Sequence, residues 1–495
     1  MQNRNKGITL IALIITIIVM LILVGVVVTV VIQSNLLGTA KTAGDKYKTA
    51  YEDESNMSEV TINGEKYASI EDYINNNPMS SIKIKMEVTH EDTAVTADGT
   101  KIKSIEHGAP IPVGYSYVTG EKNTGVVIQD DTTSDQFVWV PVLQNQKIKI
   151  EIEAKEEITE IKIEDPLGTL ITKNSENNDI TVSGKTNTSI ISPTTNGEYT
   201  VTVKTASDEA SKTLYVKSLY AQDITSMRDM YLAIIKKQAK EQNITEDEAA
   251  KVITEGQCNT VEELITTIKQ MMQQYTDSDI ATHKDSVNKY GGFYIARYEA
   301  GCDNIRKTGD SIENVTVYSQ ANKYPFNWIN QTNSITKAKE IASGKNSVTA
   351  SLINSAVWDR TLNWLEETNA VTRAELFDST SWGNYDNSKF NFTGKYSTNN
   401  GTNFTDVTTS TEKPENRDYL LGTGVTEYTK KNNIYDLAGN CWEWTTESNS
   451  SSGRVRRGGY YLDPGFVRPA YDRVYNSAAY SGPDLSFRSA LYVSL

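Results

Sequence analysis

The sequence predicts an α+β protein built from several units, with a long apolar segment at its start. Three observations lead to this prediction. Residues 8–32 form one uncharged apolar run. Residues 146–220 alternate apolar and polar side chains, which is the period of a half-buried strand. Residues 221–285 change to the apolar spacing of amphipathic helices. A chain of 495 residues is also long enough for several domains.

The composition excludes several classes of function. The net charge is -14 and the Lys and Arg residues are scattered, so no basic surface is available for nucleic acid. The cysteines Cys258, Cys302 and Cys441 lie far apart, no Cys-x-x-Cys pair occurs, and the chain has 3 histidines. These features argue against a zinc site and against a disulfide framework.

The apolar run of residues 8–32 follows the basic residues Arg4 and Lys6 and is long enough to cross a bilayer as a helix. The basic flank predicts a cytoplasmic amino terminus, which places the rest of the chain outside the cell. A cleavable secretory signal would have a shorter apolar core. The junction "KGITLIALI" resembles a prepilin-type signal, in which a peptidase cuts after the glycine. This resemblance implies cleavage between Gly7 and Ile8.

The pilin resemblance departs at Ala12, because pilins usually carry a glutamate at this position, which pairs with a neighbouring amino terminus during assembly. Residues 1–54 are therefore expected to be a prepilin-like signal with a membrane or assembly helix, and a plain signal anchor is the alternative. Association with other pilin-like subunits stays an open expectation.

The middle of the chain divides into units by the period of its side chains. Residues 55–107 are polar with short alternating pieces such as "SIKIKMEV" and predict a stalk or linker. Residues 108–145 predict two or three strands separated by Gly, Asn and Asp turns. Residues 146–220 predict an immunoglobulin-like β-sandwich that acts as a spacer, and residues 221–285 predict a helical pair. Between the two helices, "NITEDEAAKVITEGQCNT" predicts a capped helix followed by a turn.

The last unit, residues 286–495, is rich in Trp, Tyr, Gly and Asn. Its landmarks in chain order are "KYGGFYIARYEAG", "NSAVWDRTLNWLEE", "STSWGNYDNS", "NIYDLAGNCWEWTTE", "RVRRGGYY" and "LSFRSALYV". In this order they resemble the formylglycine-generating-enzyme family, also called the sulfatase-modifying-factor domain, a variant of the C-type lectin fold. The resemblance implies that residues 108–145 are the first strands of this domain, and that the sandwich and the helical pair are insertions.

The residues that make members of this family catalytic are absent. Catalytic members oxidise a cysteine of a client protein with two nearby cysteines that bind copper, and soft thiolate ligands select Cu(I). The corresponding residues 456–493 contain no cysteine, so no copper is expected. Iron-dependent relatives need a histidine cluster, and no histidine follows His283. We therefore predict that the chain is not an enzyme. A formylglycine-generating-type oxidase with relocated catalytic residues is the alternative.

The remaining thiol in the motif "NIYDLAGNCWEWTTE" is Cys441. Strand alternation predicts Trp442 and Trp444 on one side and Cys441 and Glu443 on the other. Family members carry small or apolar residues at the position of Cys441, and no histidine nearby in sequence could activate the thiol. We therefore expect Cys441 to be a packed side chain.

The same motif binds calcium in members of the family, through its first, fourth, sixth and eighth residues. The resemblance assigns these roles to Asp436, Gly439, Glu443 and the carbonyl group of Cys441. Oxygen ligands suit Ca²⁺, and glycine can adopt the backbone angles that turn carbonyl groups inward. The alternative is that Asp436 and Glu443 accept hydrogen bonds from loop amides, and both interpretations stay open.

A tyrosine-rich segment between "RVRRGG" and "FRSALY" is the predicted binding surface. Tyrosine interleaved with serine, aspartate and asparagine is the composition of antibody paratopes, and we expect that not all of these residues pack inward. The candidate ligand-binding residues are Tyr460, Tyr461, Asp463, Phe466, Tyr471, Asp472, Tyr475, Asn476, Ser477, Tyr480, Ser481 and Asp484. Trp382 is added because it lies in a Gly/Asn loop that could reach the same face, although tryptophan is first a core residue.

The placement of this segment resembles the variable region of diversity-generating-retroelement target proteins, which display changeable residues on the same lectin-like fold. The alternative is a fixed loop in a chain that is rich in tyrosine throughout, with 27 of them. The neighbouring Arg456, Arg457 and Arg488 belong to framework motifs, where arginine is expected to brace carbonyl and carboxylate groups. Trp358 and Trp364 are expected in the core.

Together these features predict a surface recognition protein with a single membrane span and an extracellular carboxy-terminal part. It would bind an extracellular protein or glycan through the tyrosine-rich segment. The alternatives are the oxidase described above and a structural minor pilin.

Overall fold

The structure is a computed structural model that describes residues 60–62, 65–67 and 81–495. It combines helices with a larger content of sheet, which confirms the α+β class. The predicted cleavage site between Gly7 and Ile8 and the predicted helix within residues 1–54 lie outside the described residues. Across the described ranges, no helix combines the length and the apolar character needed to span a membrane.

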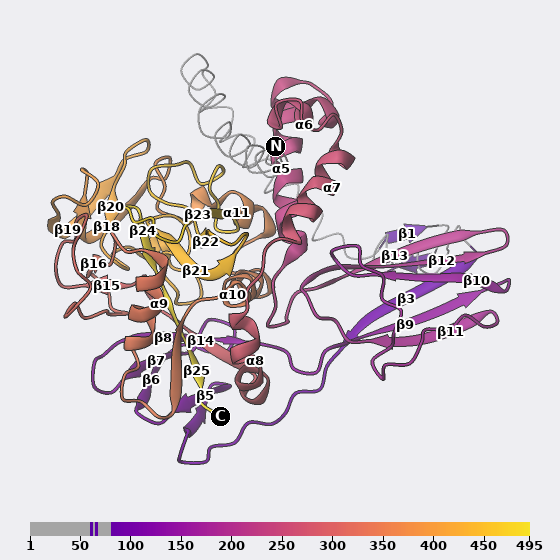
Figure 1. The fold of residues 1–495 in the computed structure, drawn as a ribbon, viewed down its shortest axis with the longest axis horizontal. Helices are drawn as coiled ribbons and strands as arrows, with labels where there is room; N and C mark the ends of the chain where they lie inside the picture. Colours follow the sequence, from indigo (N-terminus) through magenta and orange to yellow (C-terminus); the bar gives the residue numbers. More distant parts are fainter. Residues whose placement is uncertain (1–59, 63–64, 68–80) are drawn as a thin grey trace, which may run out of the picture.

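A β-sandwich forms one end of the molecule (Figure 1). One sheet has the strand order β11-β9-β3 and the other has the order β10-β12-β13. The strands are β3 (Ile82–Thr89), β9 (Lys147–Ala154), β10 (Ile158–Glu164), β11 (Thr186–Ile191), β12 (Gly197–Thr205) and β13 (Glu209–Val216). The alternation along β9 buries Ile148, Ile150 and Ile152, which share one hydrophobic core with Val201 and Val203 of β12.

The sandwich begins earlier in the chain than the sequence predicts. Strand β3 lies in the range predicted as a stalk or linker, yet it pairs with β9 from Ile82↔Ala154 to Thr89↔Lys147. The apolar residues of "SIKIKMEV" alternate as those of β9 do, so Ile82 and Met86 enter the same core. The stalk prediction is therefore wrong for this strand. Before it, β1 (Val60–Ile62) and β2 (Glu65–Tyr67) form an antiparallel pair.

The helical unit after the sandwich contains three helices within residues 221–278, all of which the structure describes: the predicted pair and the capped helix predicted between them. Its helices are α5 (Ile224–Gln242), α6 (Glu246–Ile253) and α7 (Val261–Met272). Helix α6 begins with a capping box, in which Thr245 and Glu248 bond each other's backbone amides. Met227 and Cys258 lie in the core of this unit together with Val455, which belongs to a strand outside it. The helices therefore pack against the rest of the chain.

The remaining residues, 102–141 and 279–495, form a unit that we call the head. Its largest sheet has the order β17-β25-β14-β8-β7-β6, and a second sheet has the order β23-β22-β21-β24. The first contains β6 (Tyr115–Thr119), β7 (Val127–Asp130), β8 (Gln136–Pro141), β14 (Gly292–Ala296), β17 (Val348–Leu352) and β25 (Ser489–Val493). Because β8 pairs with β14, strands β9 to β13 of the sandwich and the helical unit are inserted between two adjacent strands of one sheet, whereas β3 precedes the head in the chain.

The second sheet of the head carries the predicted binding segment. Its strands are β21 (Trp442–Ser448), β22 (Gly453–Arg457), β23 (Arg473–Ser477) and β24 (Leu485–Phe487). Smaller strand pairings involve β4 (Ile102–Glu106), β5 (Ala109–Pro112), β15 (Gly301–Cys302), β16 (Tyr324–Pro325), β18 (Phe390–Ser397), β19 (Thr405–Lys413) and β20 (Leu420–Leu421). Strand β4 also comes from the predicted stalk and instead pairs with β5.

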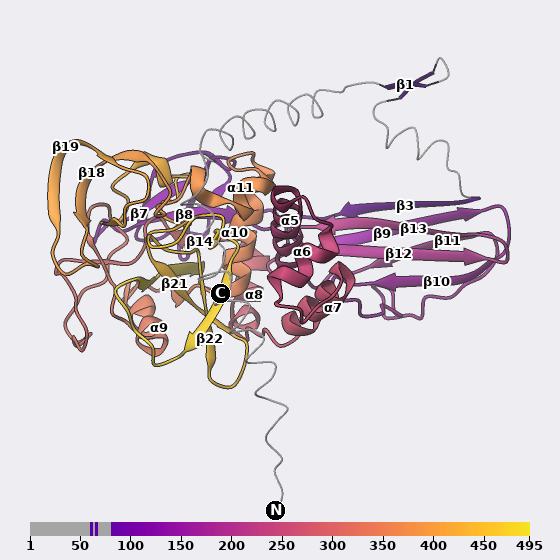
Figure 2. The ribbon, with the colours of Figure 1, turned by 90° about the horizontal axis from the view of Figure 1, so that it is seen from above.

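Helices cover the sheets of the head. They are α8 (Asp279–Tyr290), α9 (Gln331–Glu340), α10 (Ser355–Glu367) and α11 (Arg373–Phe377), with short 3₁₀ turns η1 (Ser379–Ser381) and η2 (Glu427–Thr429). Trp358 and Trp364 of α10 lie in the core, as predicted. Figure 2 shows the head at one end and the sandwich at the other, with α5 to α7 between them.

Candidate functional site

Two glycines turn the chain from β22 into the predicted binding segment. Gly458 and Gly459 both adopt the left-handed backbone region, with φ of +94° and +76°. A Cβ atom on Gly459 would lie 2.1 Å from the main-chain oxygen of Arg468, so only glycine fits at this position. The next residue, Tyr460, is thereby placed against the ring of Trp442, the first residue of β21.

A set of aromatic and charged side chains surrounds Trp442, and we call it the tryptophan cluster. It consists of Trp442, Arg456, Tyr460, Asp463, Arg468, Tyr480 and Asp484. The rings of Trp442 and Tyr460 stack with their centroids 5.8 Å apart. The guanidinium carbon of Arg456 lies 4.9 Å from the Trp442 ring centroid and 6.0 Å from that of Tyr480. Both contacts are within the range of cation–π attraction.

Aspartates balance the two arginines of the cluster. Arg456 Nη1 lies 3.7 Å from Asp484 Oδ2, while Arg468 lies 3.0 Å from Asp472 Oδ2 and 3.6 Å from Asp463 Oδ2. Burial lowers the pKa of Arg456, and burial raises the pKa of Asp463 and of Asp484. The charged forms of these three groups are therefore poorly solvated, which favours contact with a ligand of complementary charge or polarity.

Buried polar atoms of the cluster lack hydrogen-bond partners in the part of the chain that the structure describes. They are Trp442 Nε1, Arg456 Nε and Asp463 Oδ2. An unsatisfied buried polar atom costs about 1–3 kcal/mol, and such atoms are uncommon in folded proteins. Asp463 Oδ2 forms the ion pair with Arg468, whereas the two N–H donors have no acceptor among the described residues. A polar ligand that also presents a flat face would pair with these donors once the side chains that cover them move.

The structure divides the predicted ligand-binding residues into two groups. Those that are exposed or half-buried are Tyr460, Asp463, Phe466, Tyr475, Asn476, Ser477, Tyr480 and Ser481. Those that are buried are Trp382, Tyr461, Tyr471, Asp472 and Asp484. Among all of them, Tyr480 has 39% of its surface exposed and is the most exposed aromatic residue of the segment.

The prediction of a place on the binding surface is wrong for Tyr461, Tyr471 and Trp382, because each side chain is buried in the protein. The Tyr461 hydroxyl donates to Asn400 Oδ1 at 3.0 Å. The Tyr471 hydroxyl donates to Asp223 Oδ2 at 3.1 Å, and Asp223 caps helix α5 of the helical unit. The Trp382 indole donates to a main-chain oxygen. The segment packs inward more than expected because neighbouring loops and the inserted helices cover it.

Sequence reasoning missed Arg456 as a member of the site, because it assigned the three framework arginines one role. Arg457 and Arg488 do brace buried carboxylates, at 2.9 Å from Asp359 Oδ1 and 2.6 Å from Glu443 Oε1. Arg456 precedes Arg457 on β22, so its side chain points to the other face of the sheet. The alternation within "RVRRGG" is the signal that separates the two arginines.

The predicted calcium ligands already have protein partners. Asp436 accepts hydrogen bonds from the Gly424 amide at 2.8 Å and from the Thr429 hydroxyl at 2.7 Å. Both Glu443 oxygens accept hydrogen bonds from Arg488. Asp436 therefore matches the interpretation in which loop amides are the partners. Glu443 instead pairs with an arginine side chain, which neither interpretation predicts. Among the described residues no group of three His, Cys, Asp or Glu side chains could hold a metal ion, whereas the predicted calcium site combines two carboxylates with two carbonyl groups.

The other two predicted ligands, Gly439 and Cys441, occupy tightly packed positions. Gly439 has φ +73°, and a Cβ there would lie 2.2 Å from the main-chain oxygen of Asn384. Cys441 is fully buried beside Leu420 and Tyr461. Burial raises the pKa of the Cys441 thiol well above its usual value, so the reactive thiolate is disfavoured at neutral pH. Calcium binding stays a prediction.

Comparison with known proteins gives distant structural similarity. No family model matches the sequence, and no curated protein matches it. The crystal structure of CarF aligns with a TM-score of 0.25 at 11% identity, over 41% of this chain and 87% of CarF. The Treponema denticola variable protein 1 aligns with a TM-score of 0.21 at 14% identity, over 40% of this chain and 95% of that protein. TM-scores this low do not establish a common fold.

Proposed function

We propose that this chain is a membrane-anchored surface protein whose head binds an extracellular protein or glycan at the tryptophan cluster. The observation that carries the proposal is the pair of buried N–H donors without an acceptor in the described chain, Trp442 Nε1 and Arg456 Nε, which lie beside the stacked rings of Trp442 and Tyr460. A ligand that pairs these atoms would recover the free energy that their burial costs. The apolar run of residues 8–32 supports the anchoring.

The residues beside the cluster supply the rim of the proposed binding surface. Asn476 and Ser477 lie at the end of β23, and Tyr480 and Ser481 follow them before β24. Tyr480 links this rim to the cluster through its contact with Arg456. Exposed tyrosine and small polar side chains combine a large contact area with adaptable hydrogen bonding. We propose that sequence diversification, if the gene undergoes it, acts on this rim within a C-type lectin-like head.

The two alternative functions have less support. A formylglycine-generating-type oxidase needs a reactive cysteine, whereas Cys258, Cys302 and Cys441 are all buried. Burial also raises the pKa of Cys302 to about 11. A structural minor pilin rests on the resemblance of the residues around Gly7, which lie outside the described part of the chain.

A pair of tryptophan variants tests the proposed site. Trp442→Phe removes the unpaired indole N–H of the cluster and keeps an aromatic ring, so binding should weaken about tenfold if the ligand accepts that hydrogen bond. Trp364→Phe is the matched control, because the Trp364 indole nitrogen is also buried and unpaired but lies in the core around α10. Labelled full-length protein would be applied to arrays of glycans and of purified extracellular proteins.

The outcome decides between recognition and its alternatives. Selective binding that Trp442→Phe weakens and Trp364→Phe preserves would support the proposal. Binding that both variants weaken equally would contradict the site. Formylglycine production by the wild-type protein on a cysteine-containing sulfatase peptide, with copper and oxygen present, would replace recognition by the oxidase alternative.

A further inference from the structure

A cavity of about 470 Å³ lies where the sandwich meets the head, and we call it the junction cavity. Its walls come from the segments that connect the two units: the residues after β3, the residues between β8 and β9, and the residues before α5. Helix α8 of the head and the loop after β11 of the sandwich close the remaining sides. The volume is within the range of small-molecule sites in proteins. A ligand here would contact both units.

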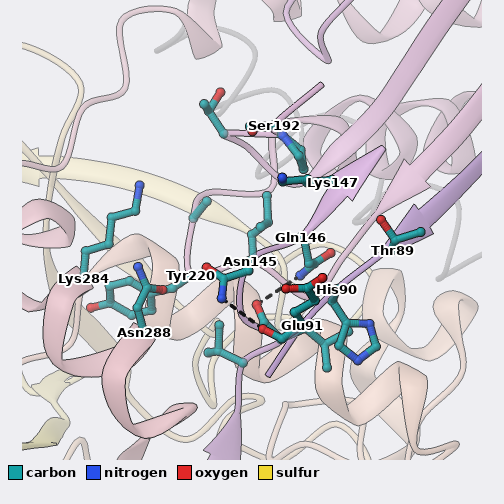
Figure 3. Close-up of a pocket in the computed structure, with 16 residues that line it drawn as sticks. Thr89, His90, Glu91, Asn145, Gln146, Lys147, Ser192, Tyr220, Lys284 and Asn288 are labelled. Atoms are coloured by element: carbon teal, nitrogen blue, oxygen red, sulfur yellow. Dashed lines mark hydrogen bonds between the residues drawn. The ribbon is translucent and has the colours of Figure 1, made fainter. Parts of the chain in front are cut away.

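The charge of the junction cavity differs from that of the protein as a whole. The chain carries a net charge of -14, yet Lys147 and Lys284 line the cavity and Glu91 is the sole carboxylate among the lining residues. In the described part of the chain, neither lysine has a salt-bridge partner. Figure 3 shows them on opposite sides of the cavity, with Lys284 on α8 and Lys147 at the start of β9. Two unpaired ammonium groups that face one space favour an anionic ligand.

A third basic residue of the lining, His90, already has an acidic partner. His90 Nε2 lies 3.6 Å from Asp92 Oδ2. The Asn145 amide donates to the main-chain oxygen of Glu91 at 3.0 Å, which holds the segment after β3 against the segment before β9. The cationic character of the cavity therefore comes from Lys147 and Lys284.

The uncharged lining residues indicate which anion the cavity suits. Ser192, Thr194 and Asn288 present exposed hydroxyl and amide groups. The half-buried Leu219 adds apolar surface on the same lining. Hydroxyl and amide groups beside an apolar surface suit a sugar ring, which offers several hydroxyl groups and one flatter C–H face.

We propose that the junction cavity binds an acidic saccharide, whose carboxylate pairs with Lys147 and Lys284 and whose hydroxyl groups bond the amide and hydroxyl side chains of the lining. This site is separate from the tryptophan cluster, so it adds a second ligand to the proposed function of the head. Because the ligand touches both the sandwich and the head, it stabilises their arrangement as well as the fold.

Calorimetric titration of the full-length protein tests this site. The probe is trigalacturonate, with maltotriose as a neutral saccharide and pentaglutamate as an acidic peptide. The Lys147→Gln/Lys284→Gln double variant should weaken trigalacturonate binding about tenfold or more, because it removes both charge-assisted contacts. Lys289→Gln is the matched control: it removes one charge from the same helix at an exposed residue that does not line the cavity. It should change the affinity by less than about twofold.

Each outcome bears on the proposal. Trigalacturonate binding that only the double variant weakens, together with a rise in melting temperature on saturation, supports it. Equal affinity for maltotriose and trigalacturonate overturns the assignment of an anionic ligand. Tighter binding of pentaglutamate overturns the assignment of a saccharide. Absence of trigalacturonate binding, or equal affinity in the double variant and the control, overturns the site. A thermal melt of both variants verifies that these exposed substitutions leave the fold intact.

Discussion

The sandwich and the head are stabilised in different ways. In the sandwich, apolar residues fill the space between two sheets, and the ion pairs lie at the surface, as between Lys149 and Glu151 of β9. In the head, arginine–carboxylate pairs lie inside the protein with no exposed surface. Examples are Arg488 with Glu443 and Arg473 with Glu447.

This difference determines what each unit can do. A core of interchangeable aliphatic side chains tolerates substitution of similar volume, so a sandwich serves well as a spacer. Buried charges require one defined set of partners, because an unpaired buried charge is costly. The head therefore holds its loops in a defined geometry, and the tryptophan cluster lies on the same sheet as these ion pairs.

Removal of a buried charge from the head should give the largest loss of stability. Arg488→Ala leaves Glu443 without its partner, close to the buried Glu299 and Asp436. The free energy of unfolding should fall by about 3–5 kcal/mol, because the negative charges then lack compensation. Chemical denaturation followed by fluorescence would measure it.

The sandwich offers the control for this substitution. Lys149→Ala removes one cation from an exposed pair on β9 and should leave the free energy of unfolding nearly unchanged. An effect as large as that of Arg488→Ala would contradict the distinction between surface and buried pairs.

The difference between the aliphatic core of the sandwich and the buried ion pairs of the head also explains how much of the fold the sequence predicts. Alternation is a local signal, so the sandwich strands are recognisable, and the error was to start the sandwich too late in the chain, at residue 146, and so to miss β3. In the head, motifs such as "NIYDLAGNCWEWTTE" indicate the fold family only by resemblance. The partner of Glu443 is 45 residues away along the chain. No local pattern identifies a partner at that separation.

A buried lysine makes the stability of the head depend on pH. Lys413 donates hydrogen bonds to the main-chain oxygens of Tyr385 and Ser388 at 2.6 and 2.8 Å. Burial lowers the pKa of Lys413 from 10.5 to about 8. Between these values the unfolded chain keeps a proton that the folded protein loses, so the contribution of Lys413 to stability rises with pH and is lost as pH falls through about 8.

Comparison of the wild-type protein with Lys413→Met isolates this contribution. From pH 8 to pH 9.5 the wild-type protein should gain about 1–2 kcal/mol relative to the variant. Denaturation at several pH values would measure the difference. A difference that is constant over this range, or that shrinks as pH rises, would contradict the role of burial.

A small deletion in the sandwich core should cost less than the removal of Arg488 from the head. Ile150→Val removes one methylene group from a fully buried side chain of β9. The expected loss is about 0.5–1.5 kcal/mol. Circular dichroism during denaturation would measure it. A loss comparable to that of Arg488→Ala would show that the sandwich core tolerates substitution no better than the buried ion pairs of the head do.

The candidate site was predicted in part. Composition located the segment, and Tyr460, Asp463 and Tyr480 do gather around Trp442. Composition could not separate them from Tyr461 and Tyr471, because a tyrosine hydroxyl finds partners equally well inside a protein. The separation depends on which surface the inserted helices cover, and this is a property of the tertiary structure.

The smallest effect should come from the rim of the proposed binding surface. Tyr480 is 39% exposed, and the guanidinium carbon of Arg456 lies 6.0 Å from the centroid of its ring. Tyr480→Ala should therefore change the free energy of unfolding by no more than about 0.5 kcal/mol. Tyr471→Ala, at a buried position whose hydroxyl bonds Asp223, should cost about 3–5 kcal/mol, in the range of other large buried aromatic residues.

The Tyr480 and Tyr471 variants together test whether recognition and stability are separable within one segment. A surface that accepts many side chains must contribute little to the fold, because each change would otherwise select against folding as well as binding. Ligand binding reduced by Tyr480→Ala at unchanged stability would meet this requirement. Equal destabilisation by both variants would mean that the rim is part of the framework, which favours the fixed loop over the diversified one.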